Sequence, residues 1–333
     1  MKNTKNFFAK FIGTSEFYIL LIIVIFSLIV QLKSGQFFTG NNLIDLARAL
    51  SIPAMFCIGE MFVLISRDTD VSFPGIASLA MYTACSQIKA NNFLVYFIVA
   101  MLIGLLLGAV NGFIIGKFKF PALIVTLGTS SICFGIMRGI LKSREYPLNK
   151  VLYALGKTNL FTFTNKQTNI NSDMPISFLI MIVVILIGYF ILNKTMLGRG
   201  IYAIGGDEIA ASRAGFNVFQ IKMFIYCFLG LMAGMIGVLR ATMLLAVHPN
   251  NLEGMEMTVI AACVLGGVKI TGGKGTVLGA VLGMVLLTII SNSLILLGIS
   301  TQWQKVFTGA IIIIGTGISV IKRKNKKKIL VAA

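Results

Sequence analysis

Apolar residues fall into ten long stretches separated by shorter polar segments. The stretches cover approximately residues 17–32, 43–66, 74–88, 93–116, 121–140, 175–192, 223–244, 254–268, 276–297 and 306–321. Most approach the roughly 20 apolar residues that an α-helix needs to cross a hydrocarbon core about 30 Å thick. The pattern predicts an all-α, polytopic bundle of about ten transmembrane helices, with residues 1–333 forming a single transmembrane domain.

The third and eighth stretches, 74–88 and 254–268, are shorter than the others. With about 15 residues each, they are too brief to cross the hydrocarbon core alone. Non-helical backbone at membrane depth is tolerated only where protein surrounds it or where it lines a water-filled cavity. We therefore expect these two helices to begin as irregular backbone that is buried in protein.

Composition and charge support a membrane protein and set its orientation. Hydrophobic residues make up 57% of the chain and charged residues 12%, whereas a soluble domain has about 25% charged residues. The net charge of +18 is explained by topology rather than by nucleic-acid binding. If both termini are cytoplasmic, most Lys and Arg residues fall on the inner side, as the positive-inside rule requires. The basic tail at 322–328 then contacts membrane lipids of the anionic leaflet.

This topology predicts two long loops and closely packed helices. The loop at 141–174 is external and the loop at 193–222 is internal. Glycines recur at a spacing of four within predicted spans, which allows helices to approach closely. These glycines are Gly104 and Gly108, Gly230 and Gly234, and Gly275, Gly279 and Gly283.

No catalytic, metal or cofactor site is predicted. His248 is the only histidine, so Ser-His-Asp catalysis and His-based metal clusters lack their parts. The segment GGVKITGGKGT, residues 266–276, fails as a phosphate-binding loop. Such a loop requires Gly where Val268 stands and Ser or Thr where Gly275 stands. The chain is therefore not expected to be an enzyme.

Charged residues within spans usually mark a transport path, because they are costly to place in the membrane. Glu60 in the second span is such a residue, and it either lines a path or has a structural role. Few other acidic groups lie in the spans, which argues against a carrier coupled to protons or sodium.

The internal loop has the sequence GRGIYAIGGDEIAASRAGFNVFQIK at 198–222. The Asp207-Glu208 pair opens an alanine-rich helical turn, and Gly215 is a plausible helix stop. A short polar helix between two spans suits docking against another protein. An ordinary interfacial connector is the alternative interpretation.

Three motifs together resemble the ribose-type permeases of bacterial ABC importers, which include the rhamnose and autoinducer-2 import permeases. They are PALIVTLGTSS at 121–131, the internal loop from 198, and EMTVIAACVLGGVKITGGKGTVLGAVLG at 256–283. The resemblance begins at about residue 40 and covers nearly all of the chain after it.

The resemblance implies an ABC importer permease fold in a bacterial inner membrane. Its partners would be a second permease, identical or different, two cytoplasmic ATPase subunits that hydrolyse the ATP, and an external solute-binding protein. The internal loop would be the segment that couples to the ATPase, through Gly205, Gly206, Asp207, Glu208, Ala211, Arg213 and Gly215.

The segment after the second span departs from the pattern of these permeases. Arg67 and Asp68 replace a glycine pair and Phe73-Pro74 alters the turn, while Asp70 and Ser72 remain. This version resembles the autoinducer-2 type slightly more than the ribose type. The solute would be a small sugar or a sugar-like molecule, which polar side chains can bind. The candidates for the translocation path are Glu60, Asp70, Asn111, Thr126 and Thr129.

Two rival functions stay open at this point. One is a self-contained channel or secondary carrier for a small polar solute, and the other is a membrane-embedded enzyme. Reconstitution separates them, because a carrier transports without an ATPase partner and an enzyme turns over its substrate in detergent.

Overall fold

The computed structural model describes residues 15–142, 144–165 and 171–300, and a few single residues between 303 and 313. Within them lie twelve helices: α2 Ser15–Ser34, α3 Gly40–Ile65, α4 Phe73–Gln87, α5 Phe93–Phe118, α6 Ala122–Gly139, α7 Lys150–Gly156, α8 Ile176–Lys194, α9 Met196–Gly206, α10 Glu208–Arg213, α11 Val218–Leu244, α12 Met255–Leu265 and α13 Val277–Leu296. The strands are β1 Tyr146–Pro147, β2 Asn159–Thr164, β3 Asn171–Pro175 and β4 Ala246–Val247.

Each of the first nine apolar stretches coincides with a helix. Seven described helices are long and apolar enough to cross a membrane, namely α2, α3, α5, α6, α8, α11 and α13. The tenth stretch, 306–321, lies almost entirely outside the described residues. The predicted polytopic helix bundle is therefore confirmed.

The short third and eighth stretches form the short helices α4, with 15 residues, and α12, with 11 residues. The segment at 66–72, which joins α3 to α4, is not helical, yet Ser66, Asp70 and Ser72 are buried. Pro74 in the first turn of α4 lacks the backbone N–H that would be unpaired there. The irregular, buried start expected for this helix is thus present in the structure.

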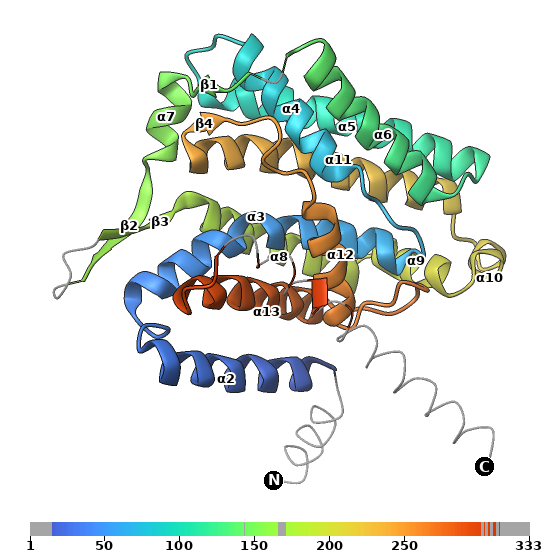
Figure 1. The fold of residues 1–333 in the computed structure, drawn as a ribbon. Coiled ribbons are helices and arrows are strands. Elements are labelled where there is room, and N and C mark those ends of the chain that lie inside the picture. The colour runs from blue at the N-terminus through green and yellow to red at the C-terminus, as the bar shows by residue number, and fades with distance from the viewer. Residues whose placement is uncertain are drawn as a thin grey trace, which may run out of the picture.

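The helices pack in two groups, which Figure 1 shows one above the other. The upper group holds α4, α5, α6 and α11, and the lower group holds α2, α3, α8, α12 and α13. The long helices α3 and α11 each pack with helices from the other half of the chain. The first-half helix α3 packs on α12 and α13, whereas the second-half helix α11 packs on α4 and α5. This exchange ties the two halves of the chain together.

Glycines permit the closest of these helix contacts, as the spacing of four predicts. A Cβ atom at Gly104 of α5 would lie 2.1 Å from the carbonyl oxygen of Gly230 in α11. In the lower group, a Cβ atom at Gly283 of α13 would lie 2.1 Å from the carbonyl oxygen of Ala262 in α12. No side chain fits at either place, so backbone meets backbone in both groups.

Four short strands accompany the helices of this mostly helical fold. The strands β1 and β4 pair antiparallel, and so do β2 and β3, and both ribbons lie at the same end of the bundle as α7 (Figure 1). Three of these strands lie in or next to the predicted external loop at 141–174. Pairing satisfies the backbone N–H and C=O groups of these non-helical segments. We call this end of the molecule the ribbon end.

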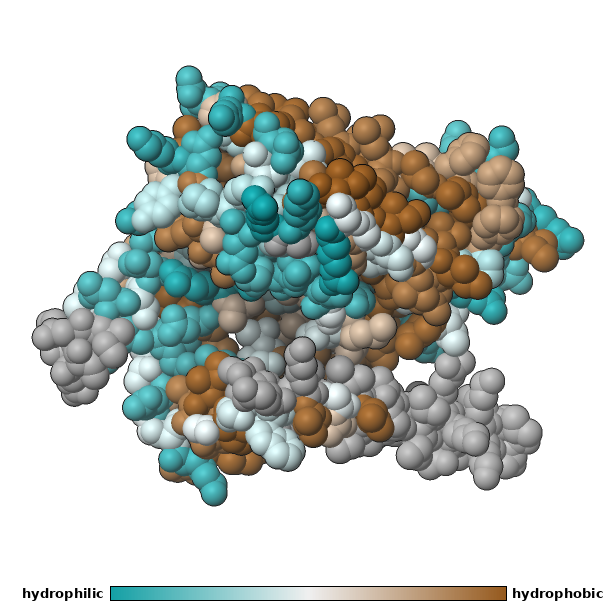
Figure 2. All heavy atoms as spheres, turned by 45° about the horizontal axis from the view of Figure 1, so that its top comes forward, coloured by the Kyte–Doolittle hydropathy of each residue, from teal (hydrophilic) through white to brown (hydrophobic). Residues whose placement is uncertain are grey.

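The surface has the distribution expected of a protein in a membrane. Figure 2 shows hydrophilic side chains at the two ends of the molecule and hydrophobic side chains over much of the surface between them. Large exposed apolar residues include Leu106 in α5, Leu186 and Phe190 in α8, and Ile124 in α6. By contrast, α3 is buried continuously from Ala54 to Ile65, so the centre of the bundle is made of protein rather than lipid contacts.

Candidate functional site

The predicted internal loop forms two short helices, α9 and α10, that lie at the opposite end of the bundle from the ribbons (Figure 1). Ile201 and Ile204 of α9 are buried against the bundle, whereas Ile209 of α10 is 67% exposed. Thus one face of α9 packs against the bundle, whereas the outer face of α10 is exposed at this end of the molecule. We call residues 196–213 the α9–α10 segment.

Four of the seven predicted coupling residues set the path of this segment; of these, Gly205 and Ala211 are buried, whereas Asp207 and Gly215 are exposed. Gly205 lies so close to α3 that a Cβ atom would be 1.7 Å from the carbonyl oxygen of Ile65. Asp207 caps α10 by accepting a hydrogen bond from the backbone N–H of Ala210 (2.9 Å). Ala211 is buried, and Gly215 ends the turn with a φ of +89°, which favours glycine. The segment therefore has a defined, rigid path.

The other three, Gly206, Glu208 and Arg213, are exposed or partly exposed. A Cβ atom added at Gly206 would meet no atom within 4 Å. Together with Ile209 they form a small surface of mixed polarity on α10 and its start. This surface is formed by the residues of this chain alone, and a partner protein could bind to it.

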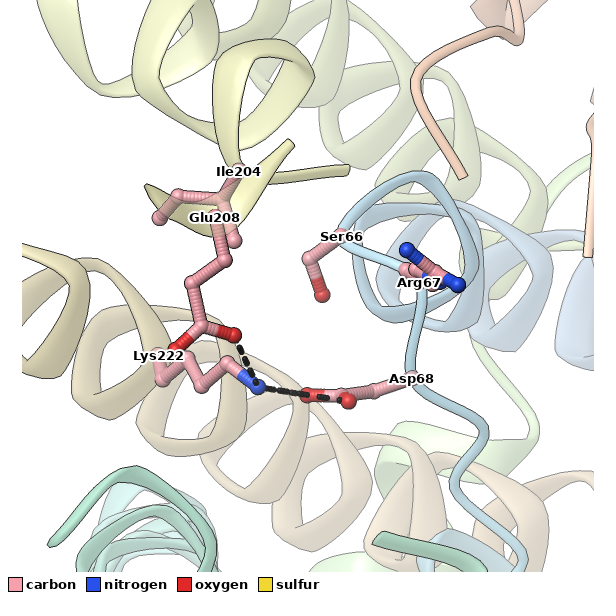
Figure 3. Close-up of a pocket in the computed structure, with 6 residues that line it drawn as sticks. All are labelled: Ser66, Arg67, Asp68, Ile204, Glu208 and Lys222. Carbon is pink, nitrogen blue, oxygen red and sulfur yellow. Dashed lines mark hydrogen bonds and ion pairs between the residues drawn. The ribbon is translucent and has the colours of Figure 1, made fainter. Parts of the chain in front are cut away.

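A buried lysine connects α10 to the irregular segment before α4. Lys222 Nζ lies 3.1 Å from Asp68 Oδ2 and 3.9 Å from Glu208 Oε2. Figure 3 shows the ammonium group between the two carboxylates, at the wall of a cavity of about 260 Å³ that Ser66, Arg67 and Ile204 also line. Burial raises the pKa of the Asp68 carboxyl, and the nearby Lys222 ammonium opposes this shift. Glu208 also pairs with the exposed Lys119 at 3.5 Å.

All five predicted path residues meet in one buried network next to Asp68. The hydroxyl and backbone N–H of Ser72 donate to Asp70 Oδ1, both at 2.6 Å. Asn111 Nδ2 of α5 donates to Ser72 Oγ (2.9 Å), and Thr129 Oγ1 of α6 donates to Asn111 Oδ1 (2.6 Å). Thr126 Oγ1 accepts from the backbone of Val71 (3.3 Å), and Glu60 Oε1 accepts from that of Asp70 (3.3 Å). The network thus joins the 66–72 segment to α3, α5 and α6.

These hydrogen bonds are satisfied within the protein, apart from Glu60 Oε2, which has no hydrogen-bond partner among the described residues. The sequence predicted these residues separately, as lining for a path. The structure brings them together as a polar core that holds the non-helical backbone before α4, and a role in translocation stays a prediction.

A second cavity, of about 400 Å³, lies between α6 and the start of α12, and the sequence analysis did not predict it. Its lining residues are Leu127, Ser130, Ser131, Phe134, Gly135, Arg138, Glu253 and Glu256. Arg138 Nη2 pairs with Glu253 Oε2 at 2.6 Å across it. Arg138 and Glu253 are charged residues in or beside predicted spans, which is a sequence signal for this site. Their pairing cannot be predicted from local sequence, because they are 115 positions apart.

Within the described residues, no group of three or more His, Cys, Asp and Glu side chains could hold a metal ion. His248 Nε2 lies 2.8 Å from Glu145 Oε1 at the ribbon end, far along the chain from the α9–α10 segment. The site chemistry visible in the described residues is therefore ion pairing and hydrogen bonding.

Comparisons with known proteins give a consistent result. A family profile described as "Branched-chain amino acid transport system / permease component" matches residues 42–315. The ribose import permease protein RbsC of Haemophilus influenzae is 32% identical over 94% of this chain and 96% of its own. The L-arabinose transport system permease protein AraH of Escherichia coli is 31% identical, over 94% and 93%. The autoinducer 2 import system permease protein LsrC of Yersinia pseudotuberculosis is 29% identical, over 89% and 81%. No solved structure matched the chain.

Proposed function

This chain belongs to the family of branched-chain amino acid transport system permease components, and we propose that it is the membrane-spanning permease of an ABC importer for a small sugar or sugar-like solute. It is a multi-pass membrane protein and a non-catalytic transport subunit. The observation that carries the proposal is the similarity over almost the whole chain to permeases named for ribose, L-arabinose and autoinducer 2.

The solute class follows these relatives rather than the family description. The family description names branched-chain amino acids, whereas the relatives compared above are named for ribose, L-arabinose and autoinducer 2. We propose an uncharged, hydroxyl-rich solute of the ribose, rhamnose or autoinducer-2 class. Leucine provides the matched test solute for the alternative.

The α9–α10 segment is the proposed docking site for a cytoplasmic ATPase subunit. Its exposed residues Glu208, Ile209 and Arg213 offer charge and apolar area at one end of the bundle. Gly205 and Ala211 fix the remainder of the segment against the bundle. A displacement of α10 would therefore also displace the helices that it packs against. With this docking site, both termini would lie in the cytoplasm of a bacterial cell and the ribbon end would lie outside.

The complete transporter would contain two permease chains, two ATPase subunits and an external solute-binding protein that delivers the solute to the ribbon end. ATP binding and hydrolysis in the partner would drive the permeases between outward-open and inward-open states. The Lys222 contacts support this scheme, because they connect the docking segment to the buried polar network.

The test is purification of the tagged chain from its native membrane in mild detergent, followed by identification of the proteins that accompany it. We expect an ATPase subunit, and proteoliposomes of the complex should import ribose, L-arabinose or autoinducer 2 when ATP and the binding protein are present. Import of leucine instead would overturn the solute class. Transport by the isolated chain under an ion gradient would establish a secondary carrier and overturn the importer.

A further inference from the structure

The cavity between α6 and the start of α12 lies at the boundary between the two helix groups. Its α6 wall belongs to the upper group, and Glu253 and Glu256 enter from the start of α12 in the lower group. Because α6 ends at Gly139 and α12 is preceded by β4, this boundary faces the ribbon end. On α6 the cavity residues Leu127 and Ser130 directly follow Thr126 and Thr129 of the buried network, so the cavity and the network share this helix.

The lining combines the groups that recognise a hydroxyl-rich molecule. Carboxylates accept hydrogen bonds from hydroxyl groups, whereas guanidinium groups donate to hydroxyl oxygens. Glu256 makes no ion pair or hydrogen bond with any described residue. The Ser130 and Ser131 hydroxyls add donors and acceptors. The volume of about 400 Å³ lies in the range of small-molecule pockets, about 300–1,000 Å³.

The same cavity has an apolar side and little steric obstruction. Leu127 and Phe134 supply surface for the C–H groups of a solute, and Arg138 lies 5.6 Å from the centre of the Phe134 ring. A Cβ atom at Gly135 would meet no atom within 4 Å, so the α6 wall is open at this residue. Arg138, the two serine hydroxyls and this apolar wall all lie on the span α6, where charge is costly at membrane depth.

We propose that this cavity is the outer solute-binding site of the importer, with Glu256, Ser131 and Arg138 as its hydrogen-bonding residues for an uncharged, hydroxyl-rich solute. The Arg138–Glu253 ion pair, with both side chains about half exposed, connects α6 to the residues before α12 across the cavity, and the solute separates the pair when it enters. This site rests on the proposed importer function and adds to it the residues that recognise the solute.

The first test measures protection by the solute. The complex is reconstituted with its binding protein, and import of ribose, L-arabinose and autoinducer 2 identifies the solute to be used. A Ser131→Cys variant is then labelled with a membrane-impermeant thiol reagent, and mass spectrometry follows the modification of that residue. We expect the imported solute to slow labelling of Cys at 131 by about threefold or more when its concentration is about twice the dissociation constant or higher.

The matched control is Thr158→Cys, which is exposed at the ribbon end, where the reagent can reach it. Thr158 does not line the cavity, so its labelling should not depend on the solute. Equal labelling of Cys at 131 with and without solute, in a complex that imports normally, would overturn the site while leaving the importer function intact. If the complex imports none of these three solutes and no rhamnose, the proposed solute class is overturned, and the site proposal with it.

The second test separates recognition from folding. Glu256→Gln keeps the size of the side chain but weakens its hydrogen bonds to hydroxyl groups. We expect KM for the imported solute to rise about fivefold with kcat changed less than about twofold, as loss of one charge-assisted hydrogen bond implies. Glu145→Gln, at the ribbon end but outside the cavity, should leave both constants unchanged. An unchanged KM for Glu256→Gln, or an equal effect of the two variants, would contradict the assignment.

Discussion

At the scale of single residues, the clearest constraint falls on Gly205, where α9 contacts the end of α3. A Cβ atom there would lie 1.7 Å from the carbonyl oxygen of Ile65 and 2.6 Å from the backbone nitrogen of Gly273. The neighbouring Gly206 has open space around it. Both glycines stand in the motif that resembles the coupling segment, yet their physical roles differ.

Gly205→Ala should therefore destabilise the protein, whereas Gly206→Ala should not. Backbone atoms must move to accept the new methyl group at 205, and overpacking of this kind costs about 1–3 kcal/mol. Thermal unfolding in detergent, followed by the loss of the monodisperse peak in size-exclusion chromatography, measures the difference. Equal midpoints for the two variants would show that the α9–α3 contact is not as close as described.

Arg213 tests the docking surface itself, because it is exposed and its loss leaves no buried group unpaired. Arg213→Trp should abolish uptake and the recovery of the ATPase subunit during purification, while membrane insertion and yield stay normal. Thr158→Trp is the matched control, since Thr158 is exposed at the ribbon end. Normal uptake by Arg213→Trp in a fully assembled complex would count strongly against docking through α10.

At the scale of elements, Lys222 links α11 to both α10 and the 66–72 segment. The Asp68 and Lys222 side chains are only 13% and 11% exposed, so the pair is buried. Asp68 is followed by Asp70 and Ser72, whose hydrogen bonds reach α5 and α6. A displacement of α10 can thus be passed through Glu208 and Lys222 to the backbone that begins α4.

Lys222→Met should uncouple ATP hydrolysis from import. We expect solute imported per ATP hydrolysed to fall about 5- to 150-fold, the range of coupling free energies of about 1–3 kcal/mol. Because Asp68 would be left buried without its partner, the single variant should also lose about 3–5 kcal/mol of stability.

The double variant Asp68→Asn, Lys222→Met separates these two effects. It should regain much of the lost stability, since no unpaired charge remains, but it should stay uncoupled. Lys119→Met removes the exposed partner of Glu208 and should change neither quantity measurably. If the double variant imports as much solute per ATP as the unmodified protein, the Lys222 link has only a structural role.

The elements that the sequence predicts well are those whose signal is local. Length alone identified α4 and α12 as short helices, and glycine spacing identified the faces of α5 and α11 that meet at Gly104 and Gly230. The strands β2 and β3 are hard to predict because only β2 has an alternating pattern, over the four residues Phe161–Thr164, and its partner β3 is polar and has none.

The candidate site was predictable only in part, for the same physical reason. The coupling residues form one continuous motif, so the sequence names them together. Asp70, Asn111 and Thr129 were each predicted, but their hydrogen-bonded network depends on how α5 and α6 pack against the 66–72 segment. The outer cavity was not predicted, because Arg138 and Glu253 come together only when the two helix groups assemble.

At the scale of the whole molecule, the two helix groups provide the parts that alternating access requires. An ion pair connects α6 to the start of α12 at the outer cavity, and the Lys222 contacts lie at the opposite end of the bundle. The long helices α3 and α11 cross between the halves of the chain and keep the groups in contact. Movement of one group against the other can therefore open one end while the other end stays closed.

This arrangement predicts that a covalent link across the outer cavity stops transport. In a variant with Arg138→Cys and Glu253→Cys, a short bifunctional thiol reagent should join α6 to the start of α12 and abolish import, because the groups can no longer separate to admit the solute. A cross-link made with a reducible form of the reagent can be cleaved, and cleavage should restore import to the level of the untreated variant.

Each single variant treated with the same reagent controls for simple modification. A pair placed on α7 alone, Lys150→Cys with Ala154→Cys, is exposed outside the cavity and controls for cross-linking within one group. Import that continues after complete cross-linking of the Arg138 and Glu253 positions would mean that solute enters without separation of the two groups at this cavity, and the path would have to lie elsewhere in the bundle.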